Sequence, residues 1–595
     1  MPPTARFLRK PYQGDTRKLL ISIDIGTTFS GVSYAILDPG QSSQIQNVTQ
    51  YPGQDRVGGD SKVQSVVLYD KDDKVVAIGD EADKEVFPEL YEIEGLQTAE
   101  WFKLYLRPSH LEREHASEID QIPKLPKNKT AIQIYSDLLA YLYNCTKRYV
   151  TERQGEKLWN SMASNIYYVL SHPNGWEGKQ QAEMRHAAVV AGLVPNEAEG
   201  RKRVSFVTEG EASLHFCINR IPDALNDHDG IMVVDCGGGT IDFSTYMRTS
   251  DSFEFKEIAP PECIFQGSAF ITRRADAFLR KILKGSKFGS DEDINTMVNI
   301  FNKTTKPSFK SSTKSYYIKF GRNSDNDANF GIRAGTIKLK GSDIAELFDP
   351  AVKSIIKAVE DKVNKCTIPI KVLFLVGGFA TSDYLFQVLE DHFKKGGISL
   401  LRPDGYLNKA VAEGAASYYL DRTVKSRVSK YDFGIPISET FNPSNPDHIA
   451  RKDRAFEVAS GDHWIGGAFS VILPKNTTVS EETEYRRPYV VQLSDNIVKS
   501  PWNETCSIQC YRGLEDHAPE WMDKAPDLFT HLCHVSADVS NLIRSLKPIV
   551  SAHGKTYYLL NFSIVLLFGL TELDAEVAWT EDVSYYLTSC IWVKS

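Results

Sequence analysis

Long apolar stretches are scarce in this chain of 595 residues. The nearest candidate, YYLLNFSIVLLFGL, is shorter than the ~18 to 20 apolar residues of a membrane-spanning helix and includes polar residues. The first residues, MPPTARFLRKPYQGDTRK, are basic and polar, without the apolar core of a secretory signal. We therefore expect a protein that does not interact with membranes and that is cytoplasmic or also nuclear.

An excess of positive charge is missing as well, since the formal net charge is −8. This balance disfavours nucleic acid and anionic membrane surfaces as partners. Cysteine is rare, with nine residues and no repeating pair spacing. Cys506, Cys510 and Cys533, with His531 and His534, leave a zinc site open as an alternative, although their spacings do not fit the usual structural zinc patterns.

The signatures of several enzyme classes are also absent from the sequence. It contains no serine-centred elbow and no metalloprotease helix. Gly554-Lys555-Thr556 resembles part of a Walker loop, but Ile549 stands where the Walker glycine is required. Because the triplet lies between strand-like runs, we predict a hairpin turn there.

Glycine, in contrast, is concentrated in IMVVDCGGGTIDFSTY (Ile231 to Tyr246), directly after the apolar residues that lead to Asp235. Glycine is costly inside a strand, so these glycines predict either a tight turn or a loop that a ligand approaches closely. LLISIDIGTTFSGVSYAILD (Leu19 to Asp38) repeats the pattern, with Asp24 ahead of its turn. A strand–turn–strand unit used twice suggests two similar half-structures that face each other.

The chemistry of these turns fits a nucleotide. Small residues expose consecutive backbone N–H groups that form an anion-binding nest, and threonine hydroxyls add donors. An aspartate ahead of each turn can hold Mg²⁺, mainly through water. A third segment, Ile370 to Phe393, predicts a buried strand, the pair Gly377-Gly378 and a helix with Ser382 or Asp383 as its N-cap. Its glycines allow a planar ring or a sugar to approach the backbone.

These segments resemble the actin-like ATPase superfamily, and most closely the seventy-kilodalton heat-shock chaperones. IDIGTTFSGV is similar to the first phosphate motif, VVDCGGGTIDFS to the second and FLVGGFATSDYL to the adenosine motif. The resemblance covers about residues 19 to 421. The β-rich sequence that follows resembles the divergent, twelve-numbered branch of that family, in a fungal-type form.

The resemblance implies an α/β fold: a two-lobed actin-like ATPase domain, made of duplicated ribonuclease-H-like halves around a nucleotide cleft, followed by a β-rich C-terminal module. The expected parts are a flexible N-terminal tail over 1–18, lobe I over 19–225, lobe II over 226–425 and a divergent β-rich module over 426–595 that binds substrates or partners.

The resemblance also implies roles for individual residues. Those expected to contact phosphates are Gly26, Thr27, Thr28, Gly237, Gly238, Gly239 and Thr240. Those expected to hold Mg²⁺ or a monovalent cation such as K⁺, mostly through water, are Asp24, Asp235 and Asp242. Those expected in catalysis are Lys103, which would place the attacking water, with Glu209, Asp235 and Thr240. Those expected near the nucleoside are Gly267, Lys306, Gly377 and Gly378.

Some positions depart from the family pattern. Phe29 replaces a tyrosine, Pro307 stands where an arginine would follow Lys306, and Thr381 replaces an arginine that flanks the base. We therefore expect an intact phosphate grip with an altered base site. The predicted function is an ATP-binding and ATP-hydrolysing chaperone that couples ATP or ADP binding to protein clients, with co-chaperones by analogy only. A nucleotide-dependent scaffold with little hydrolysis and a small-molecule kinase on the same fold remain alternatives.

Overall fold

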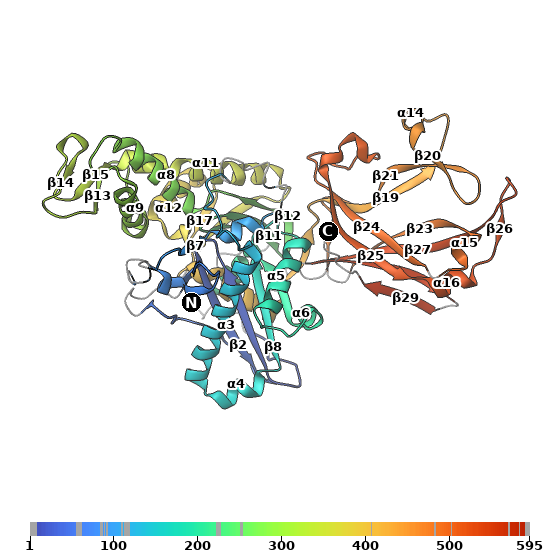
Figure 1. The fold of residues 1–595 in the computed structure, drawn as a ribbon, viewed down its shortest axis with the longest axis horizontal. Helices are drawn as coiled ribbons and strands as arrows, with labels where there is room; N and C mark the ends of the chain where they lie inside the picture. Colours follow the sequence, from blue (N-terminus) through green and yellow to red (C-terminus); the bar gives the residue numbers. More distant parts are fainter. Residues whose placement is uncertain are drawn as a thin grey trace. The chain divides into compact units, whose positions relative to one another are not determined.

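The computed structural model describes residues 9–54, 62–83, 87, 90, 93–108, 111, 120–221, 228–249, 254–405, 407–480, 483–500, 502–568, 572–581 and 584–589. The chain divides into two compact units, Met1–Val424 and Lys425–Ser595. The first unit is a mixed α/β structure with sheets and long helices (Figure 1). Among the described residues, no helix is both long and apolar enough to cross a bilayer.

The first sheet of this unit has the strand order β3-β2-β1-β8-β9. Its strands are β1 (Lys18–Ile25), β2 (Phe29–Leu37), β3 (Ile45–Asn47), β8 (Ile166–His172) and β9 (Val204–Thr208), with β4 (Val63–Gln64) paired to β2. β1 runs antiparallel to β2 and parallel to β8, and β8 runs parallel to β9. The apolar run in β1 is buried throughout, as expected of strands covered on both faces.

Alternate residues of β1 show how the two faces are covered. Ile21 and Ile23 belong to the apolar core shared with α3 (Ala131–Gln154). Ser22 points to the opposite face, where its hydroxyl donates a hydrogen bond to the carbonyl of Ala412 in α13 (Ala410–Asp421). The sheet around β1, which leads into the turn at its carboxyl end, therefore lies between two layers of helices.

The strands of the second sheet that belong to this unit have the order β17-β16-β10-β11-β12. Its strands are β10 (Gly230–Cys236), β11 (Ile241–Arg248), β12 (Phe255–Ile264), β16 (Ile370–Val376) and β17 (Ser399–Leu401). β10 is antiparallel to β11 and parallel to β16, which is parallel to β17. Order and directions match those of the first sheet, so β10 and β11 correspond to β1 and β2.

Helices and smaller sheets surround these two sheets. Helix α7 contacts β10 and β11 of the second sheet, and α13, which packs on α7, contacts β1 and β2 of the first. Within the described part of this unit, the helices of six residues or more besides α3 and α13 are α4 (Glu156–Met162), α5 (Gly178–Val190), α6 (Glu197–Arg203), α7 (Glu209–Arg220), α8 (Ser268–Ile282), α9 (Asp291–Ile300), α11 (Gly341–Lys365) and α12 (Asp383–Phe393). The small sheets are β6 (Val75–Ile78), β5 (Val66–Tyr69) and β7 (Gln97–Glu100), and β13 (Ser315–Lys319), β15 (Thr336–Lys340) and β14 (Ile332–Arg333).

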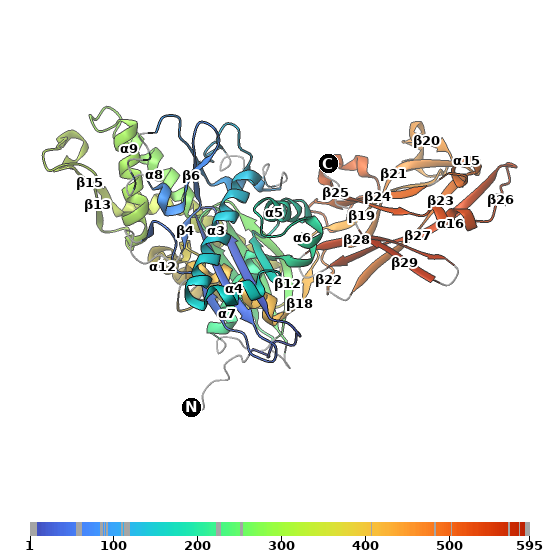
Figure 2. The ribbon, with the colours of Figure 1, turned by 60° about the horizontal axis from the view of Figure 1, so that its bottom comes forward.

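The second unit consists mainly of strands (Figure 2). One sheet contains β20 (Ala455–Glu457), β21 (His463–Leu473), β19 (Asp432–Thr440), β24 (Asn503–Tyr511) and β25 (Phe529–Asp538). The other contains β23 (Glu484–Ser494), β27 (Thr556–Phe568), β28 (Leu573–Glu581) and β29 (Ser584–Ser589), with β26 (Ile549–Val550) on β27. Ile508 and Val535 of the first sheet share one apolar core with Ile564 and Val577 of the second. The two sheets therefore bury a common interior.

The turn predicted at Gly554-Lys555-Thr556 is confirmed. β26 and β27 are antiparallel on either side of it, and Ser551 N–H donates to the carbonyl of Lys555. Gly554 has a φ of +73°, a left-handed conformation that glycine adopts without strain.

Candidate functional site

Two β-hairpins with the same register form the centre of the site. In the first, β1 and β2 pair Asp24 with Gly31. In the second, β10 and β11 pair Asp235 with Asp242. Each aspartate stands just before the turn of its hairpin, as the sequence pattern predicts. The residue opposite the aspartate differs: glycine in the first hairpin and a second carboxylate in the second.

The turns of the two hairpins meet. A Cβ atom built on Gly238 would overlap the side chain of Thr28, and one on Gly239 would overlap the side chain of Thr27. Side chains larger than hydrogen are therefore excluded from this part of the glycine loop by the opposite hairpin. The glycines therefore permit a tight turn and the close approach of the opposite hairpin, while the close approach of a ligand stays a prediction.

Helix α8 holds the glycine loop from behind. The backbone N–H groups of Gly267, Ser268 and Ala269 donate to the carbonyls of Gly239, Gly237 and Gly238 at 3.1, 3.1 and 2.8 Å. In a planar trans peptide the N–H group points away from the carbonyl, so the amides that follow these carbonyls point away from α8. The loop therefore presents consecutive N–H groups to its other side, where a polyphosphate would find an anion-binding nest.

The third predicted segment borders the same space. β16 ends at Val376, and Gly377 follows with a φ of +90° and with no room for a Cβ atom beside Cys236. Gly378, in contrast, has open space where its side chain would be. Ser382 caps α12 by accepting a hydrogen bond from Leu385 N–H, which confirms the predicted N-cap. A flat group could lie against Gly378 without backbone rearrangement.

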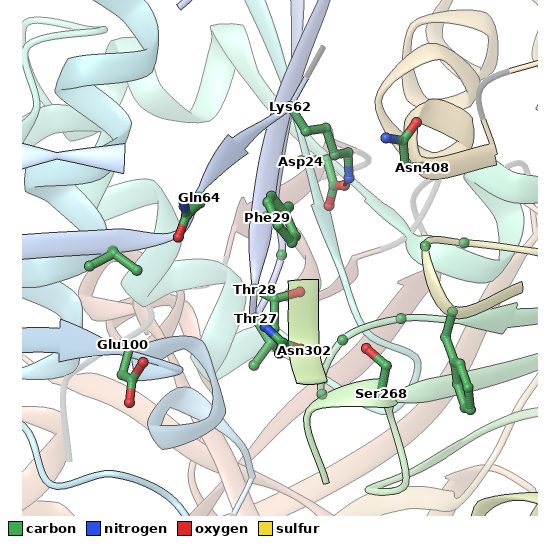
Figure 3. Close-up of a pocket in the computed structure, with 18 of the residues that line it drawn as sticks. Asp24, Thr27, Thr28, Phe29, Lys62, Gln64, Glu100, Ser268, Asn302 and Asn408 are labelled. Carbon is green, nitrogen blue, oxygen red and sulfur yellow. Dashed lines mark hydrogen bonds and ion pairs between the residues drawn. The ribbon is translucent and has the colours of Figure 1, made fainter. Parts of the chain in front are cut away.

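A cavity of about 1020 Å³ joins these elements (Figure 3). The predicted residues that line it are Asp24, Gly26, Thr27, Thr28, Lys103, Glu209, Asp235, Gly237, Gly238, Gly239, Thr240, Lys306, Gly377 and Gly378. Two others are set back from its wall: Asp242 lies on β11 beside Asp235, and Gly267 packs behind the glycine loop. The volume suits a ligand of the size of a nucleotide.

Lys103 and Glu209 form a buried ion pair at the floor of the cavity. Lys103 lies in a short 3-10 helix, Phe102–Leu106, and Glu209 is the first residue of α7. The Lys103 Nζ atom donates to Glu209 Oε1 at 2.5 Å. Burial favours the neutral form of Lys103, but Glu209 and Asp24 outweigh it and raise the pKa of the lysine. Burial raises the pKa of Glu209, and Lys103 offsets this only in part.

A second lysine, which the sequence analysis missed, pairs with Asp24. Lys62 Nζ lies 2.7 Å from Asp24 Oδ2, and the Ser171 hydroxyl donates to Asp24 Oδ1 at 3.0 Å. Figure 3 shows the side chain of Lys62 extending to Asp24. Burial opposes ionisation of Asp24, but Lys62 and Lys103 lower its pKa on balance. The available signal was Gly31, a glycine in the interior of the strand β2, where glycine is costly.

Asp235 and Asp242 have a different environment. Ser213 donates to Asp235 Oδ2 at 2.5 Å, and the backbone N–H of Asn174 donates to Asp242 Oδ1 at 2.5 Å. Neither carboxylate forms an ion pair within the part of the chain that the structure describes. Burial, followed by the neighbouring Glu209, raises the pKa of Asp235 to about 7. The same causes raise the pKa of Asp242.

The residues present fit a hydrated divalent cation. Carboxylate oxygens are the protein ligands that Mg²⁺ prefers, and the glycine cradle leaves room for phosphate oxygens as further ligands. Among the described residues there is no group of three histidine, cysteine, aspartate or glutamate side chains placed to ligate a metal directly. The zinc alternative at Cys506, Cys510 and Cys533 thus receives no support from the described residues, and a cation held through water at the hairpins stays a prediction.

Lys306 also lines the cavity and is held there by bonds to the first turns of α8 and to the segment that precedes it. Its Nζ atom donates to Asn302 Oδ1 at 2.5 Å, to Thr272 Oγ1 at 3.1 Å and to the carbonyl of Ser268 at 3.3 Å. Burial lowers the pKa of Lys306 to about 7. These three acceptors are neutral and match the three N–H donors of the ammonium group, so they hold the lysine in place without offsetting a charge on it.

A π-helix covering Phe301–Thr305 directly precedes Lys306 and Pro307. Such turns are rare and are frequent at functional sites. The altered residues are visible in the sequence, whereas no sequence pattern indicates the π-helix. Thr381 Oγ1 donates to the carbonyl of Gly378 at 2.7 Å, and Phe29, Asn408 and Glu100 also line the cavity. The cavity is thus lined by small, neutral and aromatic groups as well as charged ones.

Comparison with known proteins gives relatives over most of the chain, although no protein-family model matches. Heat shock 70 kDa protein 12A of Homo sapiens is 21% identical over 562 residues, which cover 81% of this chain and 80% of that protein. The Mus musculus protein of the same name gives the same values. Heat shock 70 kDa protein 12B of Homo sapiens is 19% identical over 567 residues, 81% of this chain and 79% of that protein. These similarities support an Hsp70-like, actin-fold family for this chain, while a fungal-type branch stays a prediction.

Proposed function

We propose that this protein binds ATP in the cavity between its two aspartate-led hairpins and hydrolyses it to ADP and phosphate. The observation that carries the proposal is the meeting of the two turns: Gly238 and Gly239 lie against Thr28 and Thr27, and α8 turns the loop amides toward the other side. Two hairpins with one register, similarity to heat-shock proteins over most of the chain and a cavity of nucleotide size give further support.

Phosphoryl transfer to water requires mainly positioning and charge stabilisation, so no covalent nucleophile is needed. In our proposal the loop amides and the hydroxyls of Thr27, Thr28 and Thr240 bind the phosphates. Lys103, fixed by its ion pair with Glu209, orients the attacking water at the terminal phosphate. Mg²⁺, when bound, would offset the charge that develops on the phosphate oxygens.

The carboxylates would hold the cation through water from both hairpins. Asp24 and Asp235 supply the nearest oxygens on the cavity wall, and Asp242 lies behind Asp235. A monovalent cation such as K⁺ beside Asp242 is part of the proposal and rests on resemblance. Gly377 and Gly378 would border the nucleoside, with Lys306 on its other side.

The two sheets of the first unit would form the lobes of an actin-like ATPase, and the strand-rich unit from Lys425 would bind a protein partner. Nucleotide state would change the affinity of that unit for protein clients. We place the protein in the cytoplasm, or also in the nucleus. Hydrogen–deuterium exchange of the second unit in ATP and in ADP tests the coupling, and identical exchange in both states would contradict it.

The binding step can be tested by calorimetry with Mg·ATP on the full chain. Gly238→Val places a side chain against Thr28 and should reduce ATP affinity by about a hundredfold or more. Gly396→Val is the matched control, because a Cβ atom there meets nothing within 4 Å. Unchanged ATP binding by a folded Gly238→Val variant would reject the proposed site.

The hydrolysis step needs a single-turnover assay with excess protein over ATP. Lys103→Ala should lower the rate of phosphate release by about a hundredfold or more while ATP still binds. The second candidate, a nucleotide-dependent scaffold with little hydrolysis, is favoured by one observation: Asp24, a predicted cation-holding residue, is already paired with Lys62. Equal and negligible rates in wild type and Lys103→Ala would favour that scaffold.

A further inference from the structure

We propose that Lys62 is a phosphate-binding residue of this site, whose ammonium group contacts the terminal phosphate of a nucleoside triphosphate and supplies part of the charge stabilisation otherwise supplied by a divalent cation. The inference rests on the proposed nucleotide site and adds a residue to it. It predicts that triphosphate binding persists in part after divalent cations are removed, and that this persistence depends on Lys62.

The location of Lys62 is built into the first hairpin. β4 pairs with β2 through Ser30 and Val63, and Lys62 directly precedes Val63. A Cβ atom on Gly31 would lie 3.2 Å from both Cγ and Cε of Lys62, so the lysine stem crosses β2 where that strand has no side chain. Gly31 is also the residue opposite Asp24. The glycine thus provides the path by which the lysine reaches the aspartate.

The ammonium group of Lys62 has capacity for a ligand. An ammonium group donates up to three hydrogen bonds. Within the part of the chain that the structure describes, its one hydrogen-bond partner is Asp24 Oδ2. Lys62 lines the same cavity as Thr27 and Thr28, whose hydroxyls face the glycine loop. A phosphate bound in that loop would therefore lie on the side of the cavity that Lys62 borders.

The charges of the site favour phosphate binding by Lys62 over a role that is limited to neutralising Asp24. Lys62 is about 9% exposed and Asp24 about 5%, and removing two such charges from water has a large desolvation cost. Asp24 already accepts a hydrogen bond from Ser171 and lies within the field of Lys103. The corresponding Asp235 is buried without any ion pair to a described residue. A buried aspartate at this register is therefore tolerated without a lysine of its own, although its pKa is then raised, so neutralisation of Asp24 need not be the whole role of Lys62.

The test measures ATP affinity of the full chain by calorimetry or with a fluorescent ATP analogue, once with Mg²⁺ and once with EDTA. The variants are Lys62→Met, which keeps the length of the stem, and Lys62→Arg, which keeps the charge. Lys353→Met is the control, because Lys353 is an exposed lysine paired with Asp349 on α11. Wild type and Lys353→Met should lose about tenfold in affinity on removal of Mg²⁺, and Lys62→Met about a hundredfold or more. Lys62→Arg should restore most of the difference.

A double variant separates phosphate binding from a structural role. Asp24→Asn/Lys62→Met removes both charges, so a lysine that merely offsets Asp24 would no longer be needed. Recovery of wild-type affinity in EDTA by this double variant would overturn the proposal, and so would equal metal dependence in wild type and Lys62→Met. Continued weak binding by the folded double variant supports it. Absence of ATP binding by wild type in Mg²⁺ would instead reject the proposed function, so the two failures are distinguishable.

Discussion

The two hairpins of the cleft share one register but have opposite electrostatic surroundings. Opposite Asp24 stands Gly31, over which Lys62 brings a positive charge. Opposite Asp235 stands Asp242, a second negative charge. Neighbouring ammonium groups lower the pKa of Asp24, whereas burial raises the pKa of Asp235. The same backbone pattern therefore places a lysine ammonium group beside the aspartate in the first hairpin. In the second hairpin it leaves two buried carboxylates that a bound cation would stabilise.

The largest expected effect comes from removing the charge of Asp24. Asp24→Asn leaves the buried ammonium of Lys62 without a counter-charge, so the free energy of unfolding should fall by about 3 to 5 kcal/mol at pH 7. Chemical denaturation of the ligand-free protein measures it. Asp391→Asn, at an exposed aspartate of α12, is the control and should change little. A stability loss no larger than that of the control would show that the pair is energetically unimportant.

The corresponding substitution in the second hairpin, Asp235→Asn, should raise the free energy of unfolding rather than lower it. The pKa of Asp235 is raised from 3.8 to about 7. Between these values the folded protein holds a proton that the unfolded chain has released, so stability falls as the pH rises through this window. Asp235→Asn should remove this penalty and raise the free energy of unfolding by about 2 to 4 kcal/mol at pH 8, with little effect near pH 4.

Thermal melts of ligand-free wild type and Asp235→Asn between pH 4 and pH 8 measure this prediction. The two curves should diverge as the pH rises, and Mg²⁺ should stabilise wild type more at pH 8 than at pH 5. Parallel curves across the range, or destabilisation by Asp235→Asn at pH 8, would contradict the proposed contrast between the hairpins.

The smallest expected effect concerns Gly31, which stands opposite Asp24 where the second hairpin has a carboxylate opposite Asp235. Gly31→Ala adds a Cβ atom 3.2 Å from the stem of Lys62 and should displace the ammonium by a few tenths of an ångström. ATP affinity in EDTA should fall by about threefold, with a smaller change in Mg²⁺. Gly396→Ala, where a Cβ atom meets open space, is the control. An unaffected affinity in EDTA would mean that Lys62 tolerates a shifted stem.

Much of the site follows from local sequence, because turns and strand ends are encoded by contiguous residues. The two hairpins, the strand before Gly377 and the Ser382 cap were all predictable from glycine, threonine and capping patterns. Lys62 was not, because it directly precedes the short strand β4 and lies 38 residues along the chain from Asp24. Its contact depends on a tertiary pairing between β4 and β2, which no periodicity indicates.

For the side of the cavity expected to hold the base, the sequence predicts only that its residues differ from the family pattern, and not how they are arranged. The sequence shows Pro307 and Thr381 where arginines were expected, but the π-helix at Phe301–Thr305 depends on how α9 packs and could not be derived. The same limit applies to Asp242 and Gly267. Their packing beside Asp235 and behind the glycine loop is a tertiary feature, and their roles toward a hydrated cation and a nucleoside stay predictions.

The attachment of α8 to the glycine loop has a mechanical consequence. Three hydrogen bonds join the start of this helix to the loop, so a displacement of the loop requires either a displacement of the helix or the loss of these bonds. The helix has 15 residues and is therefore about 22 Å long. A tilt that moves its loop end by a fraction of an ångström is carried as a lever to the far end, near Arg280 and its ion pair with Asp291. A ligand in the glycine loop can thus alter the position of Arg280, about two nanometres away, without any change in the fold.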